Sequence, residues 1–164
     1  MKTKAIVGAG AGLGMSIAKK FGQHGFRVAL IARNEEKLNQ LVIELEQLGI
    51  EAASFQADIL NKEQIDKAFA AIKEKYGFID VLEYSPTPSF DTVAPALEVT
   101  EENALYQFQY NVLGALSSVK QVLPEMLVKQ SGGLLFTTGG AAIHPVPMMG
   151  QCRNCNIRTS QLYL

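Results

Sequence analysis

A run of apolar residues passes directly into a cluster of glycines at "IVGAGAGLGMSIAKKF", residues 6–21. The β-branched residues before Gly8 predict a strand, and Leu13, Ile17 and Phe21 then recur at the spacing of one helix face. Glycines at such a junction let the backbone turn tightly and bring no side chain between a phosphate and the helix N-terminus. The segment therefore predicts a strand, loop and helix that bind a nucleotide pyrophosphate.

An ordinary tight turn is the alternative for this cluster, because glycines also make turns without any ligand. The context favours the nucleotide, since a second predicted strand ends about 20 residues further on, as a dinucleotide-binding unit requires. There the sequence reads "IARNEEK", residues 31–37, with Ala32 and Arg33 where an NAD site would carry a carboxylate. A guanidinium makes charge-assisted bonds to a 2′-phosphate, which favours NADP(H). The alternative is a solvated arginine at a helix start.

Strands and helices alternate along the rest of the chain. Helical patterns follow Asn34, a predicted N-cap, and Asn61, which is predicted to form a capping box with Gln64. The longest helical pattern covers about residues 101–129. Apolar runs predict further strands at "FRVALIA" (26–32), "EAASFQA" (51–57), "FIDVLEYS" (78–85) and "GGLLFTTGG" (132–140). This alternation predicts an α/β fold, a parallel sheet covered on both faces, in one domain spanning residues 1–164.

Bulk composition narrows the classes of partner. Charged residues make up 19% of the 164 residues and the net charge is −1, so we expect no broad basic surface for nucleic acid or anionic membrane. Charged residues and glycines interrupt every apolar run before the roughly 18 residues that a membrane span needs. The N-terminal residues enter a strand too early for a secretory signal. We therefore expect a cytoplasmic protein with a small-molecule partner.

Both cysteines lie near the end of the chain, in "GQCRNCNIRTSQLYL", residues 150–164. The spacing of Cys152 and Cys155 allows a redox pair or half of a zinc site. A zinc site needs four ligands, however, and His24 and His144 are the only histidines. Two small apolar residues in a helix are the favoured interpretation, and the sequence predicts no metal site.

Several motifs together resemble the short-chain dehydrogenase/reductase superfamily. They are the spacing Gly8-x-x-x-Gly12-x-Gly14, "ARN" after the second strand, "ADI" with Asp58 after the third, "YNVLGALSSVKQVLPEM" with Asn111, and "GGLLFTTGGAA". The resemblance runs from about Lys4 to Pro147. It implies a Rossmann-type three-layer αβα fold with a parallel sheet in the order 3-2-1-4-5, lacking the C-terminal strands of the full family fold.

The resemblance also implies a cofactor site and a substrate class. The glycine loop would hold the pyrophosphate of NADP(H), Arg33 the 2′-phosphate, and Asp58 the adenine amino group, with a solvated carboxylate as the alternative for Asp58. Family members transfer hydride between this cofactor and a small-molecule carbonyl or alcohol. The implied cofactor-binding residues are Gly8, Ala11, Gly12, Leu13, Gly14, Arg33, Asn34, Asp58, Ile59 and Ser85.

The catalytic set that the family uses is incomplete in this chain. Its relay asparagine corresponds to Asn111, for which a local backbone bond inside the helix is the alternative. Gly139 takes the place of the substrate-orienting serine, and Thr138 stands one residue before it. Cys152 and Asn156 occupy the positions of the proton-donating tyrosine and its lysine, which belong one helical turn apart. We therefore expect slow or absent hydride transfer, and a non-catalytic NADP(H)-binding or regulatory module is the alternative function.

Two further departures concern the sheet. Glu83 falls within the fourth predicted strand, and we expect its carboxylate to reach water at a strand end, the alternative being a buried, paired carboxylate. The chain stops at Leu164, where family members continue, so we expect either a shortened or frame-altered product or remaining parts that come from elsewhere. The fifth strand would then be an exposed edge. We expect self-association as a homodimer or larger oligomer through that edge and through helix 101–129, where Leu105, Phe108 and Leu116 share a side with Val112 and Val119.

Overall fold

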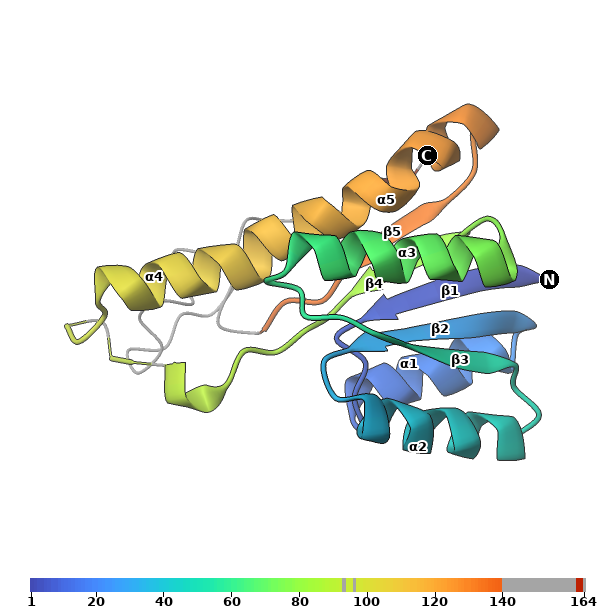
Figure 1. The fold of residues 1–164 in the computed structure, drawn as a ribbon, viewed down its shortest axis with the longest axis horizontal. Helices are drawn as coiled ribbons and strands as arrows, with labels where there is room; N and C mark the ends of the chain where they lie inside the picture. The colour runs from blue at the N-terminus through green and yellow to red at the C-terminus, as the bar shows by residue number, and fades with distance from the viewer. Residues whose placement is uncertain (93, 96, 140–161, 164) are drawn as a thin grey trace.

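The computed structural model describes residues 1–92, 94–95, 97–139 and 162–163 (Figure 1). Five parallel strands form the sheet in the predicted order β3-β2-β1-β4-β5, and β6 extends it beyond β5 in the antiparallel sense. The strands are β1 (Lys2–Val7), β2 (Phe26–Ala32), β3 (Ala52–Gln56), β4 (Val81–Tyr84), β5 (Gly133–Phe136) and β6 (Leu162–Tyr163). The predicted Rossmann-type order is therefore confirmed.

Helices cover both faces of this sheet (Figure 1). Helices α1 and α2 pack on one face, whereas α3 and α5 pack on the other, because the connections run to one side from β1 to β3 and to the opposite side from β3 to β5. A π-helical turn joins α4 to α5. The elements are α1 (Leu13–Gly22), α2 (Glu35–Gln47), α3 (Lys62–Tyr76), the 3-10 turn η1 (Phe90–Thr92), α4 (Glu101–Phe108), the π-turn η2 (Gln109–Leu113) and α5 (Gly114–Lys129).

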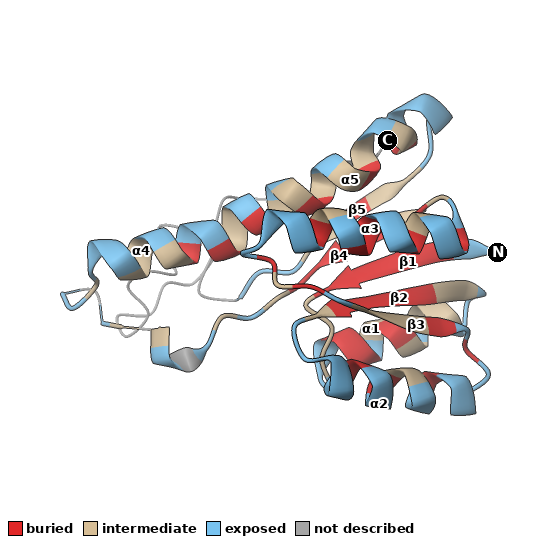
Figure 2. Cartoon of the chain, viewed as in Figure 1, coloured by how far each residue is buried: buried red, intermediate tan, exposed pale blue. Residues whose placement is uncertain are grey.

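Two apolar layers result, one on each face of the sheet. The central strands β1, β2 and β4 are largely buried, as Figure 2 shows, and this agrees with the apolar runs from which they were predicted. Ile6, Leu30 and Leu38 belong to the layer under α1 and α2, and Phe69 and Leu82 belong to the layer under α3 and α5. Among the described residues, no helix is long and apolar enough to cross a membrane.

One sequence-based expectation is corrected by this arrangement. Strand β5 is not a free edge along its whole length, because Gly133 and Leu134 pair with β6. The apolar stripe of helix 101–129, through which self-association is expected, is exposed at Leu105 (57%) and Leu116 (47%). The buried residues of the α4–η2–α5 helix lie on its other side and are Gln107, Tyr110, Gly114, Ser118, Val122 and Met126.

Candidate functional site

The glycine loop lies between the C-terminal ends of β1, β2 and β4. Gly8 has a φ of +85°, and a Cβ placed on it would lie 2.4 Å from the backbone N and Cα of Pro86. Its N–H donates to the carbonyl oxygen of Ile31, at 2.9 Å. Both the left-handed conformation and the close approach of the β4 loop therefore require glycine at this position.

The N-terminus of α1 differs from the other helix starts. Asn34, Asn61 and Thr100 each accept a backbone N–H with their side chains at the starts of α2, α3 and α4. The N-cap of α1 is Gly12, which has no side chain to do so, and the first turn carries no acidic residue. A Cβ on Gly10 or Gly12 would meet nothing within 4 Å, so this side of the loop is open. Uncapped N–H groups and the positive end of the helix dipole can therefore meet an anion here.

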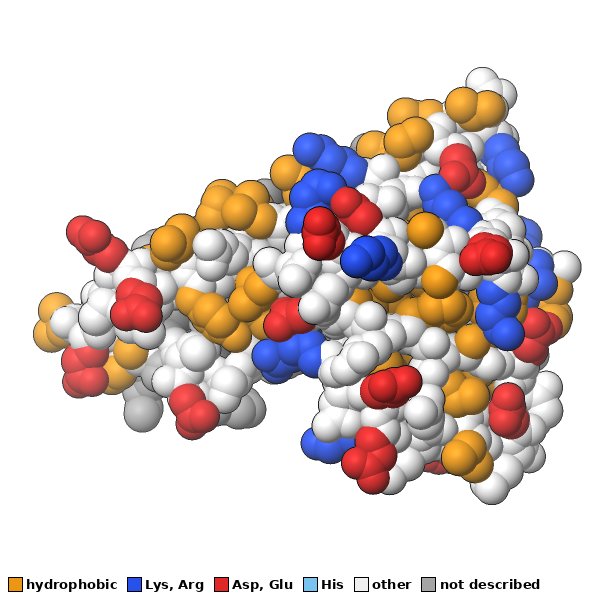
Figure 3. All heavy atoms as spheres, viewed as in Figure 1, with side chains coloured by type: hydrophobic (Ala, Val, Ile, Leu, Met, Phe, Trp, Pro, Cys, Tyr) orange, Lys and Arg blue, Asp and Glu red, His pale blue; other side chains and the backbone are white. Residues whose placement is uncertain are grey.

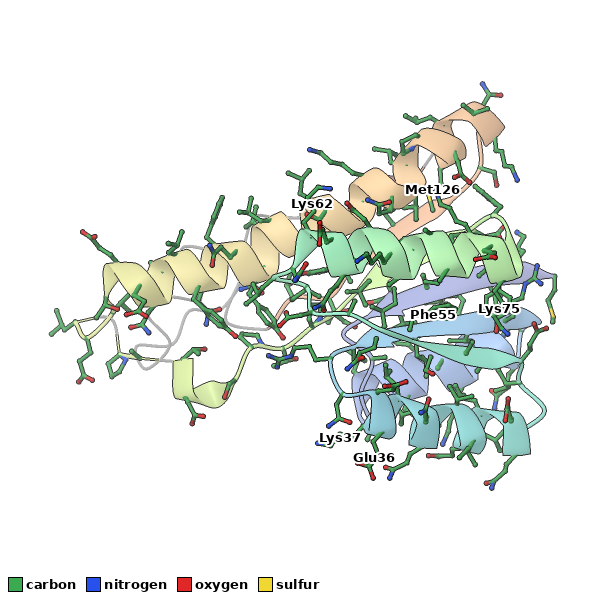
Figure 4. The ribbon with its side chains drawn as sticks, in the orientation of Figure 1. Glu36, Lys37, Phe55, Lys62, Lys75 and Met126 are labelled. Atoms are coloured by element: carbon green, nitrogen blue, oxygen red, sulfur yellow. The ribbon has the colours of Figure 1, made fainter. Side chains whose placement is uncertain are left out.

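Arg33 follows β2 and is exposed at the start of α2. Its carbonyl oxygen accepts a hydrogen bond from Gln56 Nε2, at 2.9 Å, which fixes the backbone of the strand end. Asn34 is the predicted N-cap, since its Oδ1 accepts the N–H of Lys37 at 2.9 Å. The side chain of Lys37 is exposed in the first turn of α2 (Figure 4), a second cation four positions after Arg33 that the sequence patterns did not single out.

Asp58 and Ile59 follow β3. Asp58 Oδ1 accepts the N–H of Leu60 at 3.0 Å, and the N–H of Asp58 donates to Gln64 Oε1 at 2.8 Å. Asn61 caps α3 as predicted, but Gln64 bonds to Asp58 rather than completing a capping box with Asn61. Ile59 is buried, so its side chain belongs to the core. The loop is thus held in shape by its own polar groups, with the Asp58 carboxylate half-buried.

Glu83 is buried and paired, which corrects the expectation that it reaches water. Its Oε2 lies 3.4 Å from Nζ of Lys4, whose side chain is fully buried, and its Oε1 accepts the hydroxyl of Thr137 at 2.7 Å. Lys4 Nζ also lies 3.6 Å from the centroid of the Phe21 ring. Burial lowers the pKa of Lys4 to about 8, against the raising effect of the Glu83 charge.

The sequence contains only part of the signal for the pairing of Lys4 with Glu83. Lys4 stands inside an apolar strand, as Glu83 does, and a parallel sheet with β1 next to β4 places two strand-interior charges on neighbouring strands. The observed register pairs Ile6 with Glu83, so Lys4, two residues before Ile6, points to the same face of the sheet. The missing signal was the register, which local patterns do not specify.

The end of β4 contributes a buried hydroxyl without a partner. Ser85 is 9% exposed, its N–H donates to the Val7 carbonyl oxygen at 3.0 Å, and its Oγ has no hydrogen bond among the described residues. The preceding Tyr84 donates its hydroxyl to the carbonyl oxygen of Tyr110, at 2.5 Å. An unsatisfied buried hydroxyl beside Gly8 and Pro86 is suited to a polar ligand group.

Asn111 lies in the π-turn between α4 and α5. Its Nδ2 donates to the carbonyl oxygen of Gln107 at 2.9 Å and to Gln107 Oε1 at 3.0 Å, so the local bond considered from the sequence does form. Oδ1 of Asn111 has no hydrogen bond among the described residues. Thr138, after β5, is exposed. Hydrogen bonds therefore hold the Asn111 amide in place, whereas the side chain of Thr138 is exposed to solvent.

The predicted cofactor residues all follow strands of one parallel sheet, so they gather at its C-terminal edge. The charges of Arg33 and Asp58 also act on the π-turn, since Arg33 lowers and Asp58 raises the pKa of Tyr110, whose largest shift is the rise caused by burial. Cys152, Cys155, Asn156 and His144 lie outside the described residues. Within the described part of the chain, no three His, Cys, Asp or Glu side chains are grouped to hold a metal ion.

The sequence profile of the short chain dehydrogenase family matches residues 2–151. This chain belongs to that family. A putative ketoacyl reductase of Streptomyces coelicolor is 33% identical over 149 residues, which cover 87% of this chain and 56% of that protein. A diacetyl reductase of Staphylococcus epidermidis, described as (S)-acetoin forming, is 28% identical over 87% of this chain and 55% of its own length.

Two solved structures share this fold. A variant of actinorhodin polyketide ketoreductase with NADPH superposes with a TM-score of 0.86 and 28% identity, covering 94% of this chain and 59% of that one. The L-sorbose reductase of Gluconobacter frateurii, complexed with NADPH and L-sorbose, gives a TM-score of 0.84 at 20% identity, over 94% of this chain and 58% of that one. The chain spans little more than half the length of the relatives it matches.

Proposed function

We propose that this short-chain dehydrogenase family chain binds NADP(H) and acts as an NADP(H)-dependent oxidoreductase on a small carbonyl or alcohol. The observation that carries the proposal is the glycine loop, where Gly8 permits a turn that no other residue allows and the uncapped N-terminus of α1 faces open space. NADPH would supply the hydride, which the chain itself has no group to provide.

The residues present fit this cofactor. Gly12, Leu13 and Gly14 would present backbone N–H groups to the pyrophosphate, with Ala11 beside them in the same loop. At the nicotinamide end, Ser85 brings a buried hydroxyl that has no protein partner in the described part of the chain. Such a hydroxyl gains a hydrogen bond when a polar ligand group arrives, and costs free energy when it does not.

At the adenine end, Arg33 and Lys37 are two exposed cations four positions apart, one before the N-cap Asn34 and one in the first turn of α2, and both are suited to a 2′-phosphate. Asp58 and the backbone of Ile59 would contact the adenine, and Asn34 would contribute through its backbone, because its side-chain oxygen caps α2. The NADPH in two similar solved structures supports the same cofactor, and the ketoacyl and diacetyl reductases among the relatives support a carbonyl substrate.

Binding without turnover is a second candidate function, favoured by the residues at the family's catalytic positions. Gly139, Cys152 and Asn156 stand where the serine, tyrosine and lysine belong, and only Asn111 and Thr138 bring suitable groups. A thiol is a poor replacement for the tyrosine, because proton transfer to a carbonyl oxygen requires a positioned group of matched pKa. The protein would then sense or hold NADP(H) rather than turn it over.

One pair of measurements separates the two candidates. NADPH fluorescence titration reports binding, and the loss of NADPH absorbance with a panel of aldehydes, ketones and quinones reports turnover. Binding with sustained turnover supports the oxidoreductase, and binding without turnover supports the second candidate. Failure to bind NADPH would contradict both.

Replacing Arg33 with Ala should weaken NADPH binding by about 10- to 100-fold, because one or two charge-assisted hydrogen bonds to the 2′-phosphate are lost. NADH lacks that phosphate, so its affinity should stay within about twofold. Titration of the wild type and the variant with both nucleotides gives the ratio of the two dissociation constants for each nucleotide. Lys20→Ala, which removes an exposed cation from the other end of α1, is the control. An equal loss for both nucleotides would show that Arg33 does not read the 2′-phosphate.

Self-association through the exposed side of α4 and α5 is a further expectation. Figure 3 shows hydrophobic side chains along this ridge, and Leu105, Phe108 and Leu116 are 57%, 42% and 47% exposed. We expect a dimer or larger species by light scattering at micromolar concentration, and a shift towards monomer in Leu116→Lys. A sharp monomer mass for the wild type would contradict this expectation.

A further inference from the structure

Gln107 is a polar side chain in the core that the sequence patterns did not single out. It is 2% exposed, one helical turn before Asn111 on the same side of the continuous α4–η2–α5 helix (Figure 1). Its Nε2 donates to Oγ1 of Thr92, at 2.9 Å, and its Oε1 accepts from Nδ2 of Asn111, at 3.0 Å. A buried amide needs partners on both ends, and here one end is tied to η1 and the other to Asn111.

These bonds decide which way the Asn111 amide is oriented. The second acceptor for Asn111 Nδ2 is the carbonyl oxygen of Gln107, at 2.9 Å, and a carbonyl oxygen can only accept. The NH₂ group must therefore face Gln107. Its two hydrogens have two acceptors, and Oδ1 alone is left for an outside donor.

The backbone around Asn111 is held from the opposite side. The hydroxyl of Tyr84, on β4, donates to the carbonyl oxygen of Tyr110 inside the π-turn. Gly114 makes room for this contact, because a Cβ there would lie 2.3 Å from the Tyr84 hydroxyl oxygen. Single π-turns in α-helices are frequent at functional sites, and this one has a specific side-chain partner that explains its place.

We propose that Gln107, anchored by Thr92, is a positioning residue that fixes the Asn111 amide so that Oδ1 is left to accept a hydroxyl hydrogen of a substrate or of water. The catalytic meaning of this arrangement rests on the proposed function. The orientation of the Asn111 amide does not, since it exists in the protein without any ligand.

The orientation is tested by NMR on the protein without nucleotide. In the wild type we expect the two Nδ2 hydrogens of Asn111 to exchange slowly with water, because both are donated. Gln107→Leu removes one acceptor and the link to Thr92, and exchange should become at least about tenfold faster. Gln121→Leu is the matched control, because Gln121 also donates its side-chain amide across helices, to Asp66 at 2.7 Å, and should leave Asn111 unchanged.

The Gln107→Glu variant provides a conservative rescue. A carboxyl group of the same length has an oxygen that accepts from Asn111 Nδ2 in either protonation state. Slow exchange should therefore return in Gln107→Glu, whereas it stays fast in Gln107→Leu at the same pH. A merely structural role for Gln107 would not make the exchange depend on an acceptor atom at this position.

The proposed function and the orientation of the Asn111 amide are tested by separate measurements. If the wild type reduces a carbonyl, Gln107→Leu should lower kcat about tenfold or more and leave the NADPH affinity within about twofold. Unchanged Asn111 exchange in Gln107→Leu, or an equal change in Gln121→Leu, would overturn the proposal, as would unchanged kcat in an active enzyme. Failure of the wild type to bind NADPH would sink the proposed function, whereas the exchange data would still decide the role of Gln107.

Discussion

The Gly8→Ala variant is expected to lose NADPH binding and to be destabilised by about 2–5 kcal/mol. This value adds the cost of placing a non-glycine residue in the left-handed conformation to the cost of a forced contact in a packed region. The φ of +85° disfavours any side chain, and the new Cβ would lie 2.4 Å from backbone atoms of Pro86. Backbone cannot rotate away as a flexible side chain can. The loop and the start of the β4 connection must therefore shift, and both belong to the proposed cofactor site.

Gly10→Ala is the matched control for this variant, because a Cβ on Gly10 would meet nothing within 4 Å. Chemical denaturation should place its unfolding free energy within about 0.5 kcal/mol of the wild type. NADPH titration of both variants completes the comparison. A Gly8→Ala protein with wild-type stability and NADPH affinity would show that the loop does not need its glycine.

Lys4→Met alone is expected to destabilise the protein by about 3–5 kcal/mol, because it leaves the Glu83 carboxylate buried without its cation. The Glu83 side chain is 4% exposed, and its remaining partner is the Thr137 hydroxyl. The double variant Lys4→Met, Glu83→Leu removes both charges and should be neutral or more stable than the wild type by up to about 4 kcal/mol. Denaturant unfolding of both single variants and the double variant closes a double-mutant cycle. If the changes in unfolding free energy of the two single variants add up to the change in the double variant, Lys4 and Glu83 do not act as a buried pair.

The same pair predicts a pH dependence of stability. Burial lowers the pKa of Lys4 from 10.5 to about 8, so the unfolded chain binds more protons than the folded one between these values. The unfolding free energy should therefore rise, relative to the double variant, as the pH increases from about 8 towards 10.5. A difference between the two proteins that stays constant over this range would mean that Lys4 does not titrate as a buried group.

Local sequence patterns were sufficient for most elements of the fold. Strand β2 has the predicted bounds Phe26–Ala32, and Asn34 and Asn61 cap helices where the sequence places them. Such features depend on a few neighbouring residues, through apolar runs, side-chain caps and glycine turns. The strand order followed from the family resemblance, and the structure confirms it. The roles of the cofactor residues stay predictions, although the fold brings their strand ends to one edge.

Tertiary structure alone decided which polar groups are partners. Lys4 and Glu83 are 79 residues apart, and their pairing depends on the register between β1 and β4. The long helix shows the same limit, because the burial of Gln107 and its hydrogen bond to Thr92 depend on how η1 lies against the helix.

The sequence by itself determined the glycine loop, the helix starts and the alternation of strands and helices, because hydrogen bonds and steric limits between near neighbours fix them. Only the tertiary structure decided the burial of Glu83 and the orientation of the Asn111 amide, because each depends on groups that other elements bring into contact.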